Sequence, residues 1–430
     1  MSEGKVHSEG IYHGLPSFPQ HEGKQYTALV LGSSGITGAY IVEILSKSPY
    51  WKKIVAVSRS RPHFALPDHV QHLSIDLLQD HEVIGKTLSE NDVKADYVFF
   101  SAYIQPPTAP GEGLWSNEQE LERLNVKILE NLLLALDYTG SIPKRFLLQT
   151  GAKHYGVHLG PTLTPMEESD PRYLGSPNFY FPQEDLLAAW CKKHGTSWNV
   201  TRPGFIIGAV PNAAMNEAYG LAVYASVQAE MGEGLEYPGT IAAWGLEKHL
   251  SAARLIAWHA EWAVLTAQAK NQALNISDDS MFTYGKFWPV LASWYGVSYG
   301  TPPEPVNSVQ MPYTPPPRGF GEAGKVEFAW SFQEWALRDD VQNAWRRIAE
   351  RHSLVKNPFD NVTDVFGILD GDISGPWARS ISMGKSRELG WHGYVNSHAA
   401  IFQTISELAE LKMVPPIPNK FDQVVKYVGY

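Results

Sequence analysis

The chain has 430 residues and is 44% hydrophobic, 12% aromatic and 19% charged, a composition that excludes a disordered chain and a small domain held together by disulfides. Its formal net charge is −10, which disfavours binding to nucleic acid or to anionic lipid because like charges repel. The single cysteine, Cys191, has no partner for an internal disulfide.

Residues 1–24 are rich in Gly, Ser, His and Pro and show no hydrophobic period, so we expect a flexible N-terminal arm. They contain no apolar stretch of the kind found in signal peptides. No later run reaches the roughly 18 apolar residues that a membrane helix needs. We therefore expect a cytoplasmic protein with neither membrane nor nucleic-acid partners.

From residue 25 onward, short apolar segments alternate with stretches of helical periodicity. The expected strands cover residues 27–32, 53–58, 72–77, 96–102, 145–151, 197–204 and 272–278. A strong helical stretch at 117–136 separates the fourth strand from the fifth. This alternation predicts an α/β fold, a Rossmann-like doubly wound parallel sheet covered by helices on both faces.

The chain changes character after residue 205, where Trp, Pro and Met become frequent. We expect residues 25–205 to form a dinucleotide-binding domain whose sheet is completed by about residues 272–278. Residues 206–271 and 279–430 would form a smaller, mainly helical substrate lobe, with amphipathic helical stretches at 247–269 and 342–352. Seven prolines within 301–319 predict an exposed connector, because proline blocks helices and central strands.

Three glycines, Gly32, Gly35 and Gly38, follow the first strand and open the first helix. In this context the GxxGxxG spacing predicts a dinucleotide site: the backbone turns sharply and the helix N-terminus receives the pyrophosphate. Ser34 and Ile36 lie inside the same turn and are expected to contact the cofactor. The alternative is a glycine-rich turn without a ligand.

The end of the second strand indicates which dinucleotide binds. It reads Ser58-Arg59-Ser60-Arg61, without the acidic residue that usually holds the ribose hydroxyls of NAD. Arginine binds phosphate bidentately, so we expect NADP(H) rather than NAD(H), with Arg59 the better candidate of the two arginines for the 2′-phosphate. Asp76 and Leu77, which end the third strand, are candidates for the adenine edge, although Asp76 could instead cap a helix.

Short-chain dehydrogenases pair a tyrosine with a lysine four residues later, which lowers the pKa of the phenol. Here Tyr180 is followed at that spacing by Glu184, and the nearest lysine is Lys153, directly after the fifth strand. Further cofactor contacts are expected at strand ends, from Ser101, Thr150, Pro203, Gly204 and Ile206. The sequence contains no HExxH, Cys/His cluster, calcium loop or GxSxG elbow, so neither a metal site nor a hydrolase is expected.

Five segments together carry a family resemblance: SRSRP, TGAKHY, NFYFPQED, NVTRPGFIIG and SMGKSRELGWHGYVNS. With the glycine turn, they resemble the progesterone 5β-reductase and iridoid synthase-like (PRISE) enzymes, an atypical group of extended short-chain dehydrogenases/reductases. The resemblance implies an extended Rossmann domain with a C-terminal substrate lobe, NADPH as cofactor and, in many members, reduction of the C=C bond of an activated enone. It assigns the catalytic lysine to Lys153 and the catalytic tyrosine to Tyr180.

The chain departs from the family pattern around the expected substrate pocket. Phe181 replaces the second tyrosine of NFYY, Phe205 replaces the asparagine of RPGNI, and Tyr103 stands where relatives often have tryptophan. Together with Met215 these residues are candidates for the pocket lining. The order of the motifs and the long leader resemble fungal homologues, which often serve secondary metabolism.

These observations predict an NADPH-dependent reductase of an apolar α,β-unsaturated carbonyl compound, with Tyr180 and Lys153 binding the oxygen that becomes an enolate. One alternative is a non-redox cyclase, isomerase or dehydratase of the same fold that uses the same pair for proton transfer. Another is an NADP(H)-sensing regulator without catalysis. A homodimer is the expected oligomeric state.

Overall fold

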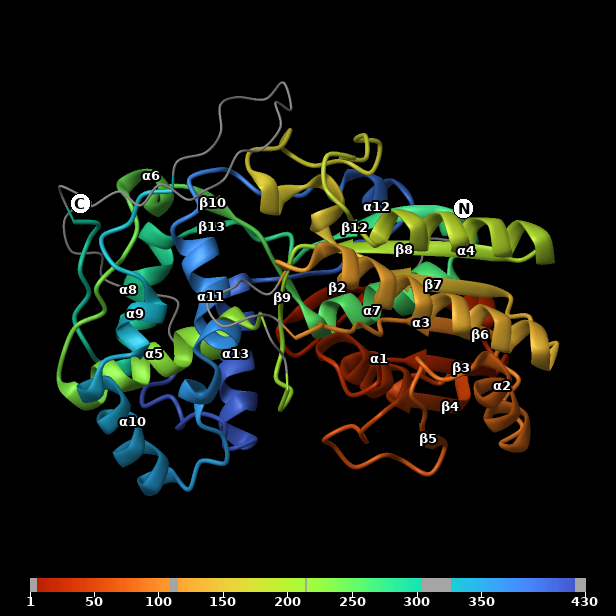
Figure 1. The fold of residues 1–430 in the computed structure, drawn as a ribbon, viewed down its shortest axis with the longest axis horizontal. Helices are drawn as coiled ribbons and strands as arrows, with labels where there is room; N and C mark the ends of the chain where they lie inside the picture. The colour runs from red at the N-terminus through yellow and green to blue at the C-terminus, as the bar shows by residue number, and fades with distance from the viewer. Residues whose placement is uncertain (1–5, 108–114, 213–214, 304–325, 422–430) are drawn as a thin grey trace.

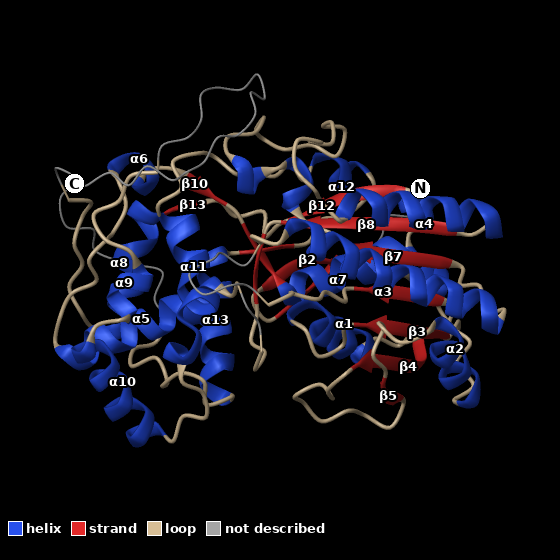
Figure 2. Ribbon diagram, viewed as in Figure 1, coloured by secondary structure: helices blue, strands red, loops and turns tan. Residues whose placement is uncertain are grey.

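The computed structural model describes residues 6–107, 115–212, 215–303 and 326–421 (Figure 1). Two parts lie side by side: a parallel sheet with helices on its faces, and a group of helices with a few short strands (Figure 2). This confirms the predicted fold class and the helical C-terminal region.

Seven strands form the central sheet in the order β12-β8-β7-β6-β3-β4-β5, and every pair is parallel. The strands are β3 (Tyr26–Leu31), β4 (Trp51–Ser58), β5 (Val70–Ser74), β6 (Tyr97–Phe100), β7 (Arg145–Gln149), β8 (Ser197–Pro203) and β12 (Gln272–Ile276). The order of connection reverses between β3 and β6, and in open α/β sheets the crevice at the carboxyl ends beside such a point binds ligands.

Alternate residues of the buried strands point to opposite faces of the sheet. Along β3, Ala28 and Val30 pack toward one face, with α1 (Ile36–Lys47) and α7 (Ala253–Leu265). Leu29 and Leu31 pack toward the other face, which is covered by α2 (His81–Glu90), α3 (Glu118–Thr139) and α4 (Tyr180–His194). Strands buried on both faces need continuous apolar runs, which is why the sequence pattern located them.

The second part contains most of the remaining helices. They are α5 (Glu217–Met231), α6 (Ile241–Trp244), α8 (Tyr284–Tyr295), α9 (Phe332–Ala336), α10 (Asp339–His352), α11 (Val362–Ile373) and α13 (Ser397–Glu410), whereas α12 (Gly384–Glu388) packs beside β12. The short strands are β9 (Phe205–Ile207), β10 (Glu247–Lys248), β11 (Leu250–Ala252) and β13 (Phe282–Thr283). Strand β9 continues from β8 and pairs in parallel with β11, so it leads the chain from the sheet into the helical part (Figure 1).

The expected flexible arm is not found from residue 6 onward. Strands β1 (Val6–Glu9) and β2 (Tyr12–Pro16) form a hairpin, and β2 also pairs with β14 (Tyr394–Val395). The side chains of Tyr12, Leu15 and Phe18 are buried in the main core. The sequence pattern missed this because the apolar residues here are sparse and their burial depends on a strand near the far end of the chain.

Two predicted elements differ most from the structure. The third strand was expected at 72–77, but β5 is Val70–Ser74, because the Asp76 carboxylate accepts a hydrogen bond from the Leu78 backbone N–H at 2.9 Å and makes a turn there. The helical stretch expected at 247–269 begins instead as β10 and β11, with α7 following and ending in the short 3-10 helix η4 (Ala267–Ala269).

The predicted helix at 342–352 is confirmed as the C-terminal part of α10. Of the proline-rich connector expected at 301–319, residues 304–319 lie outside the described residues. Within the parts of the chain that the structure describes, none of the helices combines the length and the apolar character needed to cross a bilayer.

Candidate active site

The glycine turn lies between β3 and α1, at the reversal point of the sheet. Gly32 has a φ of +82°, and a Cβ on it would lie 2.8 Å from backbone atoms of Ala102. A Cβ on Gly38 would lie 2.2 Å from the Gly32 carbonyl oxygen. Gly35 caps α1, which begins at Ile36, and its N–H donates to that same carbonyl at 2.9 Å. The turn is therefore as tight as a dinucleotide-binding turn requires.

At the end of β4, hydroxyl groups connect the strand to the glycine turn. The Ser58 and Ser33 hydroxyl oxygens are 2.7 Å apart, and Ser58 donates to the Ser60 carbonyl at 2.6 Å. The Ser60 hydroxyl reaches Ser34 at 3.4 Å. Ser58 is buried, whereas Arg59 is exposed beside this serine cluster. The structure thus brings Ser34, Ser58 and Arg59 to one place, as the sequence predicted.

The other predicted cofactor residues lie at neighbouring strand ends. The Ser101 hydroxyl donates to the Leu31 carbonyl at 3.0 Å, beside Gly38. Asp76 makes the turn after β5, and the buried Leu77 accepts a hydrogen bond through its carbonyl from Asn131 at 2.8 Å. Their contacts with a cofactor stay predictions.

The ends of β7 and β8 are joined directly. The Thr150 N–H donates to the Thr201 carbonyl at 2.8 Å. A Cβ on Gly151, the next residue, would lie 3.5 Å from the Pro203 carbonyl oxygen. Gly204 is anchored through its N–H to the Ser251 hydroxyl at 2.9 Å, and Ile206 lies in β9 opposite Ser251. Small or backbone groups therefore line this part of the sheet edge.

Lys153 and Tyr180 belong to two separate segments beside this edge. Lys153 lies in the 3-10 helix η2 (Ala152–Tyr155), directly after β7, and Tyr180 is the first residue of α4. A Cβ on Gly151 would lie 3.1 Å from the Tyr180 hydroxyl oxygen, so the phenol rests over the end of β7. Neither the ammonium nor the phenol has a hydrogen-bond partner among the described residues. Both remain available to an oxygen atom of a bound molecule.

One buried amide holds the two segments together. The Asn178 side-chain N–H₂ donates to the Lys153 carbonyl at 3.0 Å, and its oxygen accepts from the Tyr180 N–H at 3.2 Å. The sequence reasoning did not single out Asn178, although it belongs to the NFYFPQED segment. Its amide offers a donor and an acceptor at once, which is what joining two backbone segments requires.

Burial changes the proton affinity of both head groups. It lowers the pKa of Lys153 to about 8, although the charge of Glu118 acts in the opposite direction. It raises the pKa of Tyr180 well above its ordinary value, with further upward contributions from Tyr103 and Glu184. At neutral pH Tyr180 is therefore a neutral phenol that can donate a hydrogen bond.

Aromatic side chains surround the pair. The Lys153 nitrogen lies 5.0 Å from the centre of the Trp115 ring, a cation–π contact. The Tyr103 ring lies 5.9 Å from Phe179, which in turn contacts the Tyr180 ring at 4.5 Å. Tyr103 was a predicted pocket residue, whereas Trp115 and Phe179 were missed because nothing in their local sequence distinguishes them from core aromatics.

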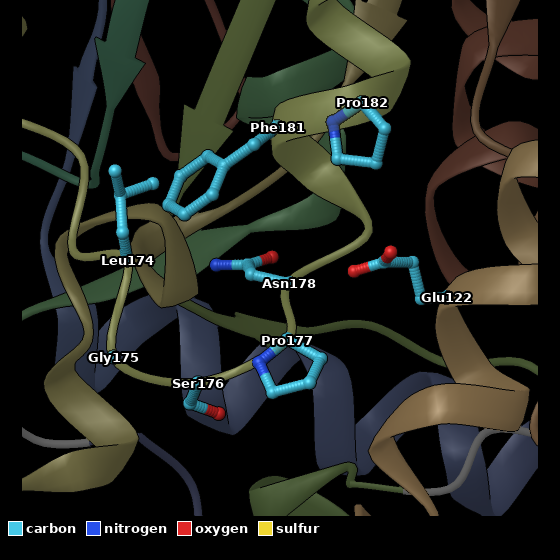
Figure 3. A pocket seen from close by; sticks show the side chains of 8 residues that line it. All are labelled: Glu122, Leu174, Gly175, Ser176, Pro177, Asn178, Phe181 and Pro182. Atoms are coloured by element: carbon cyan, nitrogen blue, oxygen red, sulfur yellow. The ribbon is translucent and has the colours of Figure 1, made fainter.

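The remaining predicted pocket residues are more widely spread. Phe181 lies against His154 at 5.2 Å and faces a hollow beside the start of α4. Figure 3 shows this hollow, which is lined by Glu122, Leu174, Gly175, Ser176, Pro177, Asn178, Phe181 and Pro182. The Phe205 ring lies 5.4 Å from the Arg379 guanidinium, and Met215 donates through its N–H to the Asp364 carbonyl at 3.3 Å. Their contacts with a substrate stay predictions.

Glu184 occupies the position where short-chain dehydrogenases usually place lysine. Its carboxylate contacts the side chains of Arg202, Arg172 and His154. Arg202 of β8 reaches its two oxygens at 3.2 and 3.3 Å, Arg172 lies at 3.1 Å, and His154 Nδ1 lies at 3.3 Å. Burial acts to raise the pKa of Glu184, but the contact with His154 and the charge of Arg202 bring it below its ordinary value. The carboxylate is therefore ionised and neutralised in place.

A family model described as a PRISE-like Rossmann-fold domain matches residues 28–312. The chain belongs to this family. The resemblance inferred from the five motifs is thus confirmed.

Several curated proteins are similar to this PRISE-like chain over most of their length. A short chain dehydrogenase, gsfE, of Penicillium aethiopicum is 29% identical and covers 90% of this chain and 99% of its own. The (S)-8-oxocitronellyl enol synthase ISY1 of Nepeta cataria is 30% identical, with 90% and 93% covered. An uncharacterized protein of Schizosaccharomyces pombe is 30% identical, with 91% and 98% covered.

Solved structures show the same fold at low identity. The enzyme WbmG of Bordetella bronchiseptica, in complex with NAD and UDP, gives a TM-score of 0.56 at 13% identity and covers 91% of this chain and 97% of its own. The UDP-glucose 4-epimerase of Thermotoga maritima gives 0.55 at 14%, with 89% and 99% covered. This PRISE-like chain therefore shares the fold of WbmG and of the UDP-glucose 4-epimerase.

Proposed function

We propose that the protein is an NADPH-dependent reductase that acts on an apolar α,β-unsaturated carbonyl compound in the cytoplasm, with a homodimer as its working state. The observation that carries the proposal is the pair formed by Tyr180 and Lys153. Asn178 ties the backbones of these two residues together, and neither polar head has a hydrogen-bond partner among the described residues.

The residues at the sheet edge fit a dinucleotide carrying a 2′-phosphate. The tight turn through Gly32 and Gly38 excludes side chains at the helix N-terminus where a pyrophosphate would lie. Ser34 with the exposed Arg59 offers hydroxyl and guanidinium donors, and no carboxylate directly follows β4 to oppose a phosphate. When bound, NADPH would supply the hydride for the reduction.

The protein's own groups then act on the substrate oxygen. Tyr180, held as a neutral phenol, donates a hydrogen bond to the carbonyl oxygen, and the Lys153 ammonium adds positive charge beside it. Negative charge grows on this oxygen as the enone becomes an enolate, so both interactions strengthen as the barrier is approached. Trp115, Tyr103 and Phe179 make an apolar surround in which such interactions gain strength.

The names of the plant relatives support this chemistry. They are called (S)-8-oxocitronellyl enol synthases, and an enol is what an enolate becomes when its oxygen receives a proton. A phenol that keeps its proton at neutral pH can stabilise that oxygen by donating a hydrogen bond to it.

The direct experiment incubates the purified protein with NADPH and a panel of apolar enals and enones, and follows cofactor absorbance and product formation together. We expect one equivalent of NADPH to be consumed for each saturated product or its enol. Product formation without NADPH loss would instead identify a cyclase, isomerase or dehydratase. Tight binding of both NADP⁺ and NADPH without consumption of any carbonyl compound would identify a cofactor-sensing regulator.

Replacing Tyr180 by Phe removes the hydroxyl and keeps the ring. We expect kcat to fall by about 100- to 1,000-fold, the usual loss for one oxyanion donor, while the dissociation constant for NADPH changes little. Steady-state kinetics and calorimetric titration with the cofactor measure the two quantities. A Tyr180→Phe variant with wild-type kcat would exclude the oxyanion role.

A further inference from the structure

Glu184 touches neither the ammonium of Lys153 nor the phenol of Tyr180 through any hydrogen bond, yet it lies between their segments. It follows Tyr180 by one turn of α4, and its carboxylate reaches His154, the residue after Lys153, at 3.3 Å. The His154 ring packs edge-on against Phe181, the residue after Tyr180, at 5.2 Å. His154 and Phe181, which follow Lys153 and Tyr180 in the chain, are therefore packed against each other.

Arg202 extends this contact to two more strands. Besides Glu184, its guanidinium donates to the Tyr155 hydroxyl at 3.4 Å, and that hydroxyl donates to the Asn275 side chain of β12 at 2.6 Å. Arg202 and His154 are 4% and 2% exposed. Buried charges of this kind persist only when they are paired, so the network holds the ends of β7, β8 and β12 and the start of α4 in one arrangement.

We propose that Glu184, together with Arg202 and His154, is a positioning group that keeps Lys153 and Tyr180 in register and balances the positive charge beside the Lys153 ammonium. This role rests on the proposed function of the pair, and it explains why a carboxylate is tolerated where related enzymes place lysine.

The electrostatic part of this proposal rests on the charged groups around Lys153 and Tyr180. The Lys153 ammonium faces the Trp115 ring and the charge of Glu118 of α3 on one side. The cations of Arg202 from β8 and Arg172 from the preceding loop are both paired with Glu184, and their charges act on His154, the residue after Lys153. Tyr180 faces the Tyr103 hydroxyl and the Glu184 carboxylate.

Glu184→Gln keeps the shape but removes the negative charge. Arg202 is then a buried, uncompensated cation, and we expect the ammonium of Lys153 to lose its proton at a pH lower by about 1. The titration can be followed by NMR on the protein with ¹³C-methylated lysines, with the resonance assigned through Lys153→Met. This readout needs no substrate, so it tests the network even if no enone is consumed.

A second experiment measures the kinetics of the variants with an enone that the wild-type protein consumes. We expect Glu184→Gln to lower kcat by about 100-fold, the cost of misplacing reacting groups by about 1 Å, with little change in KM and with the alkaline limb of the pH profile moved to lower pH. Asp185→Asn is the matched control, because Asp185 is the next residue of α4 and, among the described residues, its carboxylate pairs with Arg172 alone, at the surface. It is expected to change none of these quantities.

The Glu184→Asp variant tests the effect of geometry separately from the effect of charge. It also replaces Glu184→Gln as the test if the Gln variant does not fold. It keeps the negative charge, so the Lys153 titration is expected to stay in place, but its shorter side chain cannot reach Arg202 and His154 equally, and kcat should fall. The proposal is overturned if Glu184→Gln matches Asp185→Asn in both titration and kcat, or if Glu184→Asp retains the wild-type kcat.

Discussion

Arg59 and Ser58 are neighbours with opposite surroundings. Ser58 is buried and hydrogen-bonded on both sides, whereas Arg59 is held through its carbonyl by the Ser74 hydroxyl at 3.0 Å and leaves its side chain exposed. A fixed backbone with an exposed guanidinium is pre-organised for an anion. The sequence predicts this role for Arg59 because the preference for NADP(H) over NAD(H) depends on which side chain follows one strand.

Replacing Arg59 by Gln removes the charge that we assign to the 2′-phosphate. We expect the dissociation constant for NADP⁺ to rise by about 10- to 100-fold, the value of one charge-assisted contact, while the constant for NAD⁺ is unchanged. Isothermal titration with both dinucleotides measures this. Arg61→Gln is the control and is expected to have a smaller effect; equal weakening of NADP⁺ and NAD⁺ binding would contradict the assignment.

The unit formed by β3, the glycine turn and α1 shows what an element adds to its residues. The helix can start so close to the strand only because Gly38 has no side chain: a Cβ there would lie 2.2 Å from a backbone oxygen and 3.0 Å from the Ser101 hydroxyl. The spacing of the glycines predicted the turn, but the contact with Ser101 depends on β6, which lies beside β3 only in the folded sheet.

Replacing Gly38 by Ala forces this turn open. We expect a loss of about 1 to 3 kcal/mol in the free energy of unfolding, as for other overpacked sites, together with weaker binding of either dinucleotide. Urea denaturation and cofactor titration measure the two effects. Gly371→Ala in α11 is the control: a Cβ there meets nothing within 4 Å, so this variant should gain about 0.5 to 1 kcal/mol. A Gly38→Ala variant of wild-type stability would contradict the close packing.

On the scale of the whole molecule, one apolar cluster joins the sheet to the helical part. The same core that contains α1 and α7 continues through buried residues of α5, α8, α11 and α13. Within it lies a group of buried charges: Lys248 and Arg379 both bind Asp372, at 3.4 and 2.6 Å. The Tyr284 hydroxyl lies within hydrogen-bond distance of both Glu217 and Asp372, 2.7 Å from the latter.

This geometry implies that Glu217 carries a proton. The Tyr284 hydroxyl has a single hydrogen and can donate to only one carboxyl group, and Asp372 already faces two cations, so Glu217 is the group that must donate. Burial, together with the charge of Asp372, raises the pKa of Glu217 to about 8 from its ordinary value of 4.5. The unfolded chain releases this proton at a lower pH than the folded protein does.

The sign of the pH dependence follows from this difference. The contribution of Glu217 to stability is complete below pH 4.5 and is lost as the pH rises through about 8. We expect Glu217→Gln, whose amide can still donate to Tyr284, to flatten the decline of the free energy of unfolding over this range. Urea denaturation at several pH values measures it. Glu230→Gln, which removes a carboxylate bound at the surface by Arg347 and Arg351, is the comparison; parallel slopes for wild type and Glu217→Gln would refute the proton assignment.

The sequence by itself determined the seven strands, the glycine turn and the membership of the family, because each of these is written in local periodicity or in a contiguous motif. It placed the boundaries less well where a side chain ended an element, as Asp76 does after β5. The tertiary structure alone decided that Tyr12, Leu15 and Phe18 pack into the core, that Asn178 joins the two site segments, and that Glu184 is bound by Arg202 and His154. These outcomes depend on contacts between segments far apart in the chain, which no local pattern records.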